Sequence, residues 1–474
     1  GLLIMRASVA RYLLLLVILA SNCFFLGHAQ DDATEDFDTP SDEDPSRHAV
    51  GIDMDGDGSI DGYDYDGDGK IDDIEPESGF GKVDDDDGYE WPTIFEAADD
   101  MLDVSLLMYP IAQLRKRAKE TPEVFKDAAA VLKEPITAKE IGAMLMENRG
   151  VLVEELEESN TQVLEQVLDA IIERQRKASD EDHSKREMTA TLVNFADDNS
   201  QSELVYAVGV DNARRRVTVA FRGSVTLKDF HQDAQIWMQR IDNPLAAIQG
   251  QPKDIRIHHG FYEYLYYATT SGETRTDGIT PKSKYERILD QAKVLLQKYP
   301  DYKLFVAGHS LGAALASVFA FMASTDEEVP GPVTCVSVAS PFVGGVNFRK
   351  AFQYQEKEGR LRYLRIVNHG DIVTIMPFYA INLGAYKHVG IELKLYGDKY
   401  TLRYPKGSQG NALVRTWSTS VFNNLSTQYL VNHSPGEYDI RLEVTKEDLS
   451  SMYLNDLYQD AKHVGRSIAK KAKK

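Results

Sequence analysis

The pentapeptide Gly308-His309-Ser310-Leu311-Gly312 constrains this chain more than any other feature, because of the segments on either side of it. A short apolar run, residues 304–307, precedes it and predicts a buried strand, and an alanine-rich run, residues 313–320, follows and predicts a helix buried all round. A serine on the sharp turn between such a strand and helix has the geometry of a nucleophile elbow. The flanking glycines fit, because side chains there would collide with neighbouring elements. We therefore predict that Ser310 is a catalytic nucleophile.

The first 29 residues have the pattern of a secretory signal. Arg6 and Arg11 precede an apolar run from Tyr12 to Leu26, and Gly27-His28-Ala29 offers the small residues that a signal peptidase prefers. An uncleaved signal anchor is the alternative. Elsewhere no uninterrupted apolar stretch approaches the ~20 residues that a membrane span requires. We expect residues 1–29 to be removed, and the mature chain to be secreted or kept in the secretory pathway without a stable transmembrane span.

The acidic character of the chain is confined to one segment. The net charge is −21, and residues 31–90 hold 24 acidic against 3 basic residues, which accounts for all of it. The rest is balanced, and apart from the short lysine-rich end, residues 470–474, there is no basic patch of the kind that nucleic acid needs. We expect no nucleic-acid partner, and we interpret the lysine-rich end as a solvated helix end.

Two successive twelve-residue patterns in this acidic segment predict calcium-binding loops. In each, oxygen-bearing side chains recur at the calcium-ligand spacing and a glycine at position 6 allows the sharp turn. The loops share Asp64, so no helix fits between them, and they resemble tandem Asp-rich calcium repeats of extracellular proteins more than an EF-hand pair. A disordered acidic linker is the alternative. The candidate ligands are Asp53, Asp55, Asp57, Ser59, Asp61, Asp64, Asp66, Asp68, Lys70, Asp72 and Glu75.

A helical region, residues 93–187, follows the acidic segment. Thr137 and Glu140 form a capping-box pattern, and apolar residues between Val163 and Ile172 recur at helical spacing. We interpret these stripes as packing surfaces; a lipid-binding role is the less favoured alternative.

From about residue 188 the pattern changes to strands. Two runs, residues 204–210 and 216–221, flank a turn and predict a pair of strands. Cys335, the one cysteine outside the signal segment, lies within the apolar run 333–338, and we expect a buried strand residue without chemistry.

The later part of the chain contains candidates for the acid and the base of a catalytic triad. The apolar run 364–367 predicts a strand that ends shortly before Asp371. An acid just beyond a strand that follows a nucleophile elbow is where the triad acid belongs, and a histidine must come later still. The two histidines that we consider for this role are His388, 17 residues beyond Asp371, and His433, 62 residues beyond it.

Several motifs together resemble the fungal-type (class 3) lipases, over roughly residues 188–440. They are Phe221-Arg222-Gly223-Ser224, His259-Gly260-Phe261, the pentapeptide at 308–312, Ala339 to Gly344, and Asp371. The resemblance implies an α/β-hydrolase fold, a mostly parallel central sheet with flanking helices, preceded by the helical region and the acidic calcium-loop segment. The expected organisation is a signal peptide (1–29), an acidic segment (30–92) with calcium loops at 53–75, a helical region (93–187), the hydrolase domain (188–445), and a C-terminal helix with a basic tail (446–474).

The same resemblance implies roles for individual residues. Ser310 corresponds to the nucleophile and Asp371 to the triad acid, while Ser224 and the backbone N–H of Leu311 correspond to the oxyanion hole. The family's catalytic histidine stands in a His-x-x-x-x-Tyr context, which selects His433 over His388. The sequence departs from the family pattern after Pro341 and near Pro377, which leaves the details of the substrate pocket open.

The function that these residues imply is that of a serine ester hydrolase, which cleaves acylglycerols or related lipid esters through an acyl-enzyme. We expect no cofactor for catalysis and a structural or docking role for calcium. The amphipathic segment 225–243 suits a lid that opens at a lipid–water interface; a surface helix is the alternative. A lipid acyltransferase on the same fold is a competing function, as is a calcium-dependent scaffold or adhesion protein with an inactive hydrolase domain. The intact set of four site residues argues against the scaffold.

Overall fold

The computed structural model describes residues 50–52, 62–64, 88–125, 128–150, 152, 190–197, 204–223, 237–266, 282–377, 386–404, 428–459 and 470–471. The chain divides into two compact units. One comprises residues 1–73 and 408–429 and contains two short antiparallel strands, β1 (Val50–Ile52) and β2 (Gly62–Asp64). The backbone of Asp64 lies in β2; the other predicted calcium ligands fall outside the described residues.

The second unit, residues 74–407 and 430–474, is built on a ten-stranded sheet. Its centre is parallel, from β6 through β9, β10 and β12 to β14, and its remaining neighbours pair antiparallel. In spatial order the strands are β16 (Lys470–Lys471), β15 (Lys399–Arg403), β14 (Ile391–Leu395), β12 (Leu361–Asn368), β10 (Val333–Val338), β9 (Lys303–His309), β6 (Arg216–Phe221), β5 (Tyr206–Asp211), β4 (Ala190–Ala196) and β3 (Ile136–Thr137). A smaller antiparallel sheet has the order β13 (Tyr386–Lys387), β11 (Gly344–Gly345), β8 (Asp254–His258) and β7 (Met238–Asp242).

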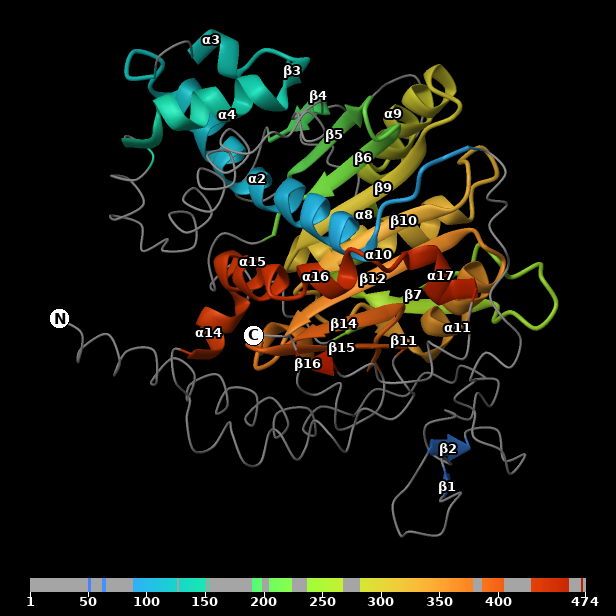
Figure 1. Cartoon of the computed structure of the whole chain (residues 1–474). Helices are drawn as coiled ribbons and strands as arrows, with labels where there is room; N and C mark the ends of the chain where they lie inside the picture. The colour runs from blue at the N-terminus through green and yellow to red at the C-terminus, as the bar shows by residue number, and fades with distance from the viewer. Residues whose placement is uncertain are drawn as a thin grey trace, which may run out of the picture. The chain divides into compact units, whose positions relative to one another are not determined.

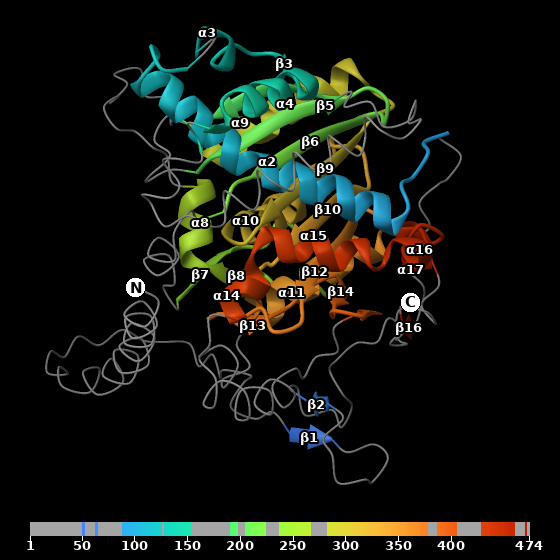
Figure 2. The same ribbon diagram turned by 60° about the vertical axis from the view of Figure 1, so that its left-hand side comes forward.

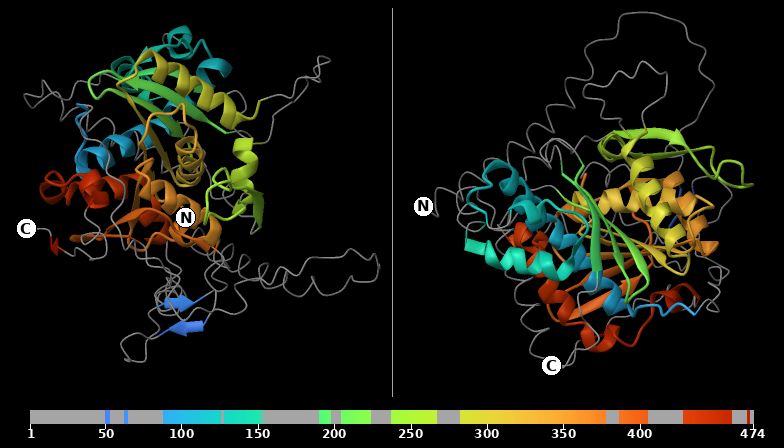
Figure 3. Two further views of the ribbon diagram at one scale, coloured as in Figure 1. Left: turned by 90° about the vertical axis from the view of Figure 1, so that its right-hand side faces the viewer. Right: turned by 90° about the horizontal axis from the view of Figure 1, so that it is seen from above.

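Helices cover both faces of the large sheet, and β9 shows why. Leu304 and Val306 point into the core beneath α10 (Leu311–Ser324), α9 (Lys284–Lys298) and α8 (His259–Tyr266), whereas Phe305 and Ala307 point to the opposite face. That face is covered by α2 (Ile94–Glu120), α15 (Pro435–Glu443) and α17 (Leu454–Gln459) (Figures 1 and 2). The same layers are visible end-on in Figure 3, with α2 in blue and the C-terminal helices in red on one side. The α/β-hydrolase fold predicted from the sequence is confirmed.

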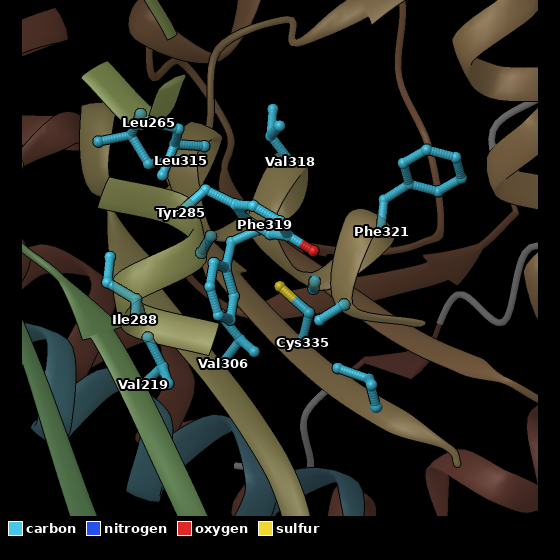
Figure 4. Close-up of a cluster of buried hydrophobic side chains, with 14 of the residues drawn as sticks. Val219, Leu265, Tyr285, Ile288, Val306, Leu315, Val318, Phe319, Phe321 and Cys335 are labelled. Atoms are coloured by element: carbon cyan, nitrogen blue, oxygen red, sulfur yellow. The ribbon is translucent and has the colours of Figure 1, made fainter. Parts of the chain in front are cut away.

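Figure 4 shows the core on the α10 face. Phe319 of α10 packs edge-on against Tyr285 of α9, and Val306 of β9 lies beside it. Cys335 of β10 is fully buried in the same cluster, as the apolar run around it predicts. This apolar layer fixes α10 on the sheet, and with it the turn at the start of α10.

Helix α2 belongs to the same unit as the sheet. Thr93 is its N-cap, and the side chains of Thr93 and Glu96 form a capping box. Near its start Asp100 forms an ion pair with Arg214, with Nε and Oδ2 2.6 Å apart. Near its end Arg115 pairs with Asp197 at 3.2 Å. The predicted helical region therefore contributes one of the layers on the central sheet.

The structure tests three local predictions, each in part. Residues 238–242 of the expected lid form β7, a strand rather than a helix, because β8 supplies a hydrogen-bonding partner; residues 225–236 lie outside the described part. Lys470–Lys471 pair with the edge strand β15, so this part of the basic tail is a strand and not a helix end. The capping box at Thr137 is confirmed at the start of α4, and residues 163–172 lie outside the described part. The remaining helices are α3 (Ala128–Val131), α4 (Ala138–Glu147), α11 (Val346–Lys357), the 3₁₀ helix η3 (Val373–Ile375), α14 (Gln428–His433) and α16 (Lys446–Leu449).

A carboxyl group is buried where α11, β15 and α17 meet. Glu356 is fully buried and accepts hydrogen bonds from the hydroxyls of Tyr404 and Tyr458. Burial raises the pKa of Glu356 from 4.5 to about 7, although both hydroxyls, Arg362 and Arg349 act in the opposite direction.

This raised pKa predicts a stability that falls as pH rises. The protonated form is favoured by folding, so the contribution is fully present below pH 4.5 and is lost as pH rises through 7. Glu356 should remove about 3 kcal/mol of unfolding free energy over this window. Urea denaturation of the wild type and of Glu356→Gln at pH 5 and pH 8 measures the effect. The glutamine variant should lose less stability between the two values, and equal losses would contradict the assignment.

Candidate active site

Ser310 lies at the turn between β9 and α10 with a strained backbone. Its φ of 59° and ψ of −125° lie outside the regions that side-chain-bearing residues prefer. A Cβ at Gly308 would lie 2.2 Å from the carbonyl oxygen of Gly312, and one at Gly312 would lie 2.2 Å from the carbonyl oxygen of Phe221. Both contacts involve backbone, which cannot move aside, so both positions require glycine. The nucleophile-elbow geometry predicted from the pentapeptide is present.

The structure brings Ser310, His433 and Asp371 together in one hydrogen-bonded series. The Oγ atom of Ser310 lies 3.0 Å from Nε2 of His433, and Nδ1 of His433 lies 2.9 Å from Oδ2 of Asp371. His433 is the last residue of α14, and Asp371 follows β12. Because a carboxylate can only accept, Nδ1 carries the proton and Nε2 is left to accept from the serine hydroxyl.

Asp371 is held by further donors. The hydroxyl of Tyr438 donates to Oδ2 at 2.6 Å, and the backbone N–H of Val373 donates to Oδ1 at 2.9 Å. The Tyr438 hydroxyl in turn accepts from the backbone N–H of Asn368 at 3.0 Å. Burial and the nearby Asp371 raise the pKa of Tyr438 well above its usual value, so it remains a donor. Tyr438 is the tyrosine of the His-x-x-x-x-Tyr pattern, so its spacing from His433 was the signal for this contact.

The alternative base, His388, lies in a different environment. Its ring is buried, stacks on Phe342 with 3.8 Å between centroids, and lies with Nε2 3.0 Å from the carbonyl oxygen of Thr374. Burial lowers its pKa well below the usual value. His388 therefore has the contacts of a packed core residue and not of a base beside Ser310.

Of the two predicted oxyanion-hole residues, one is described. Leu311 is the first residue of α10, where backbone N–H groups have no partner within the helix and the helix dipole favours negative charge. Ser224 lies outside the described residues. Gly223, directly before it in the chain, is buried beside the elbow: a Cβ there would lie 3.1 Å from the Cβ of Ser310.

One contact at the site comes from α2 and had no signal in the sequence. Tyr109 is buried on α2, and its hydroxyl lies 3.0 Å from Nδ1 of His309, the residue before the elbow serine. The Nε2 atom of His309 lies 3.2 Å from the backbone carbonyl oxygen of His433. Burial lowers the pKa of His309 well below its usual value and raises that of Tyr109, so both rings are neutral.

The comparisons with known proteins match a part of the chain that contains Ser310 and Asp371. Residues 218–380 match the family model of class 3 lipases. The resemblance inferred from the motifs is therefore confirmed for this segment, which contains Ser310 and Asp371 and ends before His433. The predicted calcium loops lie outside the match.

The matched relatives cover only part of the chain. The chloroplastic galactolipase DONGLE of Arabidopsis thaliana is 31% identical over 210 residues, which is 38% of this chain and 41% of that protein. Phospholipase A1-II 4 of Oryza sativa subsp. japonica is 35% identical over 191 residues, 38% of this chain and 43% of that protein. The chain thus spans less than half the length of both relatives. Among solved structures, a triacylglycerol lipase from Penicillium expansum is 24% identical, covers 44% of this chain and 71% of its own, and has a TM-score of 0.34.

The described part of the chain shows neither a cluster of metal ligands nor a helix suited to span a membrane. No group of three or more His, Cys, Asp or Glu side chains there is arranged to hold a metal ion. Within the same residues, no helix is long and apolar enough to cross a bilayer. The predicted calcium ligands, apart from the backbone of Asp64, fall outside the residues to which these findings apply.

Proposed function

We propose that this chain is a serine hydrolase of lipid esters, with Ser310 as nucleophile, His433 as general base and Asp371 as the acid that orients the base. The observation that carries the proposal is the hydrogen-bonded series from Ser310 Oγ through His433 to Asp371, at 3.0 and 2.9 Å, on a strained elbow. Structural serines rarely occupy such a backbone conformation, because the strain has to be offset elsewhere in the fold.

The reaction then proceeds in two halves. Nε2 of His433 takes the proton of Ser310 as Oγ bonds to the ester carbonyl carbon, and Asp371 stabilises the imidazolium. The oxyanion accepts from the N–H of Leu311 and from donors of Ser224. The imidazolium protonates the leaving alcohol as the carbon–oxygen ester bond breaks, which leaves an acyl-enzyme. Water, deprotonated by His433, then releases the fatty acid and restores Ser310.

We infer a lipid as the ester substrate, met at a lipid–water interface. The similarity of residues 218–380 to class 3 lipases supports this, and the names of the relatives, galactolipase and phospholipase A1, favour polar acyl lipids beside di- and triacylglycerol. An acyltransferase would use the same acyl-enzyme with a lipid alcohol in place of water. Secretion through the signal pattern of residues 1–29 belongs to the same proposal.

We also propose that the loops at 53–75 bind Ca²⁺ and support the enzyme without entering the chemistry. The doubled pattern of oxygen ligands in the sequence supports this role. No proton transfer in the reaction above requires a metal.

The test follows fatty-acid release from a soluble short-chain ester, emulsified di- and triacylglycerol, phosphatidylcholine and galactolipid, each with Ca²⁺ and with a chelator. A fluorophosphonate, which reacts with activated serines, is added in parallel, and the labelled peptide is identified by mass spectrometry. We expect release from the lipid esters, label on Ser310, and lower thermal stability with chelator. Absence of both release and label in a folded chain that binds Ca²⁺ would contradict the hydrolase and favour the scaffold function. Transfer to an added alcohol in preference to water would favour the acyltransferase.

A further inference from the structure

Helix α2 meets the nucleophile elbow from the face of the sheet opposite α10. The alternation along β9 puts His309 on the same face as Phe305 and Ala307, the face that α2 covers. Tyr109 projects from α2 to meet the His309 ring, with 6.0 Å between ring centroids and 3.0 Å between the hydroxyl and Nδ1. Both side chains are buried, so water does not substitute for either partner.

The direction of each hydrogen bond in this contact is fixed by its acceptor. The carbonyl oxygen of His433 can only accept, so the atom of His309 that faces it, Nε2, carries the proton. A neutral imidazole carries one proton, so Nδ1 must accept, and the Tyr109 hydroxyl is its donor.

The oxygen of the Tyr109 hydroxyl also lies close against the backbone of Gly223. A Cβ on Gly223 would lie 2.3 Å from this oxygen, and the proximity of the Gly223 backbone lowers the pKa of Tyr109, against the larger effect of burial. Gly223 directly precedes Ser224, to which the oxyanion role is assigned above. The Tyr109 hydroxyl therefore contacts both the chain at the end of β6 that leads to Ser224 and the ring of His309 at the elbow. Through His309 it is also linked to the backbone carbonyl of His433.

Two ion pairs, one on each side of Tyr109 along α2, hold this helix in position on the sheet. The ion pair of Asp100 with Arg214 lies nine residues before it on α2, and the pair of Arg115 with Asp197 lies six residues after it. Arg214 lies in the turn between β5 and β6, and Asp197 directly follows β4, so both ion pairs join α2 to the antiparallel part of the central sheet. Because α2 lies outside residues 218–380, the segment similar to class 3 lipases is completed by a residue from elsewhere in the chain.

We propose that Tyr109 is a positioning residue for the ester hydrolysis: through its hydroxyl it aligns the Gly223 backbone, His309 and the carbonyl of His433, and so fixes the oxyanion side and the base side of the site relative to Ser310. This inference rests on the proposed function. It assigns to the N-terminal helical region a share in setting kcat.

The test compares kcat and KM on a soluble short-chain ester for the full chain and for Tyr109→Phe, with active enzyme counted by fluorophosphonate titration. The variant keeps the ring and removes the hydroxyl. We expect kcat to fall about 10-fold with KM within about 2-fold, because Tyr109 is buried and the change removes only its alignment of the site. Tyr363→Phe is the matched control: its buried hydroxyl contacts Ser317 and Ser337 at 2.6 and 2.7 Å, away from Ser310. It should lower the melting temperature to a similar extent and leave kcat unchanged.

A second variant changes His309, the other residue of the same contact. His309→Asn should also lower kcat at constant KM, and adding Tyr109→Phe to it should cost little more, because the tyrosine acts through the histidine. This variant also serves as the test should Tyr109→Phe not fold. Full kcat in Tyr109→Phe, fully additive losses in the double variant, or an equal kcat loss in Tyr363→Phe would each overturn the proposal. A folded wild type that neither releases fatty acid nor takes up the label would overturn the proposed function, and the role of Tyr109 with it.

Discussion

Replacing His433 with alanine is expected to lower kcat on a soluble ester by about a millionfold, to the level of a Ser310→Ala chain. Removal of either the nucleophile or the base of a serine triad costs about this much in a serine protease, because the two act as one unit. Here the 3.0 Å contact between Nε2 and the serine Oγ is the path by which the proton leaves Ser310. Steady-state rates at saturating ester, with folding checked by circular dichroism, measure the effect.

The matched control is His388→Asn, because His388 is the alternative to His433 as the triad base. Its ring lies on Phe342 and against the carbonyl of Thr374, so the variant should lose stability through packing and one hydrogen bond. Its kcat, expressed per folded molecule, should stay within a few-fold of the wild type. A millionfold loss in His388→Asn together with retained activity in His433→Ala would contradict the choice of base and with it the assigned triad.

The three residues of the hydrogen-bonded series could be predicted from the sequence because each has a local signature. Ser310 lies between two glycines whose missing side chains permit the turn, Asp371 comes just after an apolar strand, and His433 stands five residues before Tyr438. Such local signatures are visible in a sequence because the chemistry requires a particular backbone conformation or spacing, which restricts the neighbouring residues. The central sheet could be predicted for a similar reason, since its buried parallel strands are continuous apolar runs.

The contact between Tyr109 and His309 could not be predicted, because it joins positions 200 residues apart. In the sequence Tyr109 is one apolar residue of a helix among many, and nothing in its spacing distinguishes a site residue from a core residue. The surface helix, the alternative to a lid at residues 225–243, is not found at residues 238–242 for a related reason. A short segment of mixed apolar and polar residues takes the secondary structure that its neighbours stabilise, and here β8 offers a strand edge for hydrogen bonding.

Replacing Gly312 with alanine is expected to destabilise the fold by more than about 4 kcal/mol and to leave little soluble chain. The added Cβ would lie 2.2 Å from the carbonyl oxygen of Phe221 and 2.9 Å from the carbonyl carbon of Arg222. Both are backbone atoms where β6 ends, and β6 lies at the centre of the sheet, hydrogen-bonded to β5 and β9. Relief would therefore require α10 to move off the sheet, and α10 carries much of the core on that face.

Urea denaturation and the soluble yield of Gly312→Ala, beside Gly397→Ala, measure this effect. At Gly397 nothing lies within 4 Å of an added Cβ, so the same methyl group should change the unfolding free energy by less than about 1 kcal/mol. Wild-type stability in Gly312→Ala would mean that α10 and the end of β6 separate in solution. The end of β6 and the N–H of Leu311 would then not share a fixed geometry. The close approach that forbids a side chain at Gly312 is thus also what holds the end of β6 against the first turn of α10, which begins at Leu311.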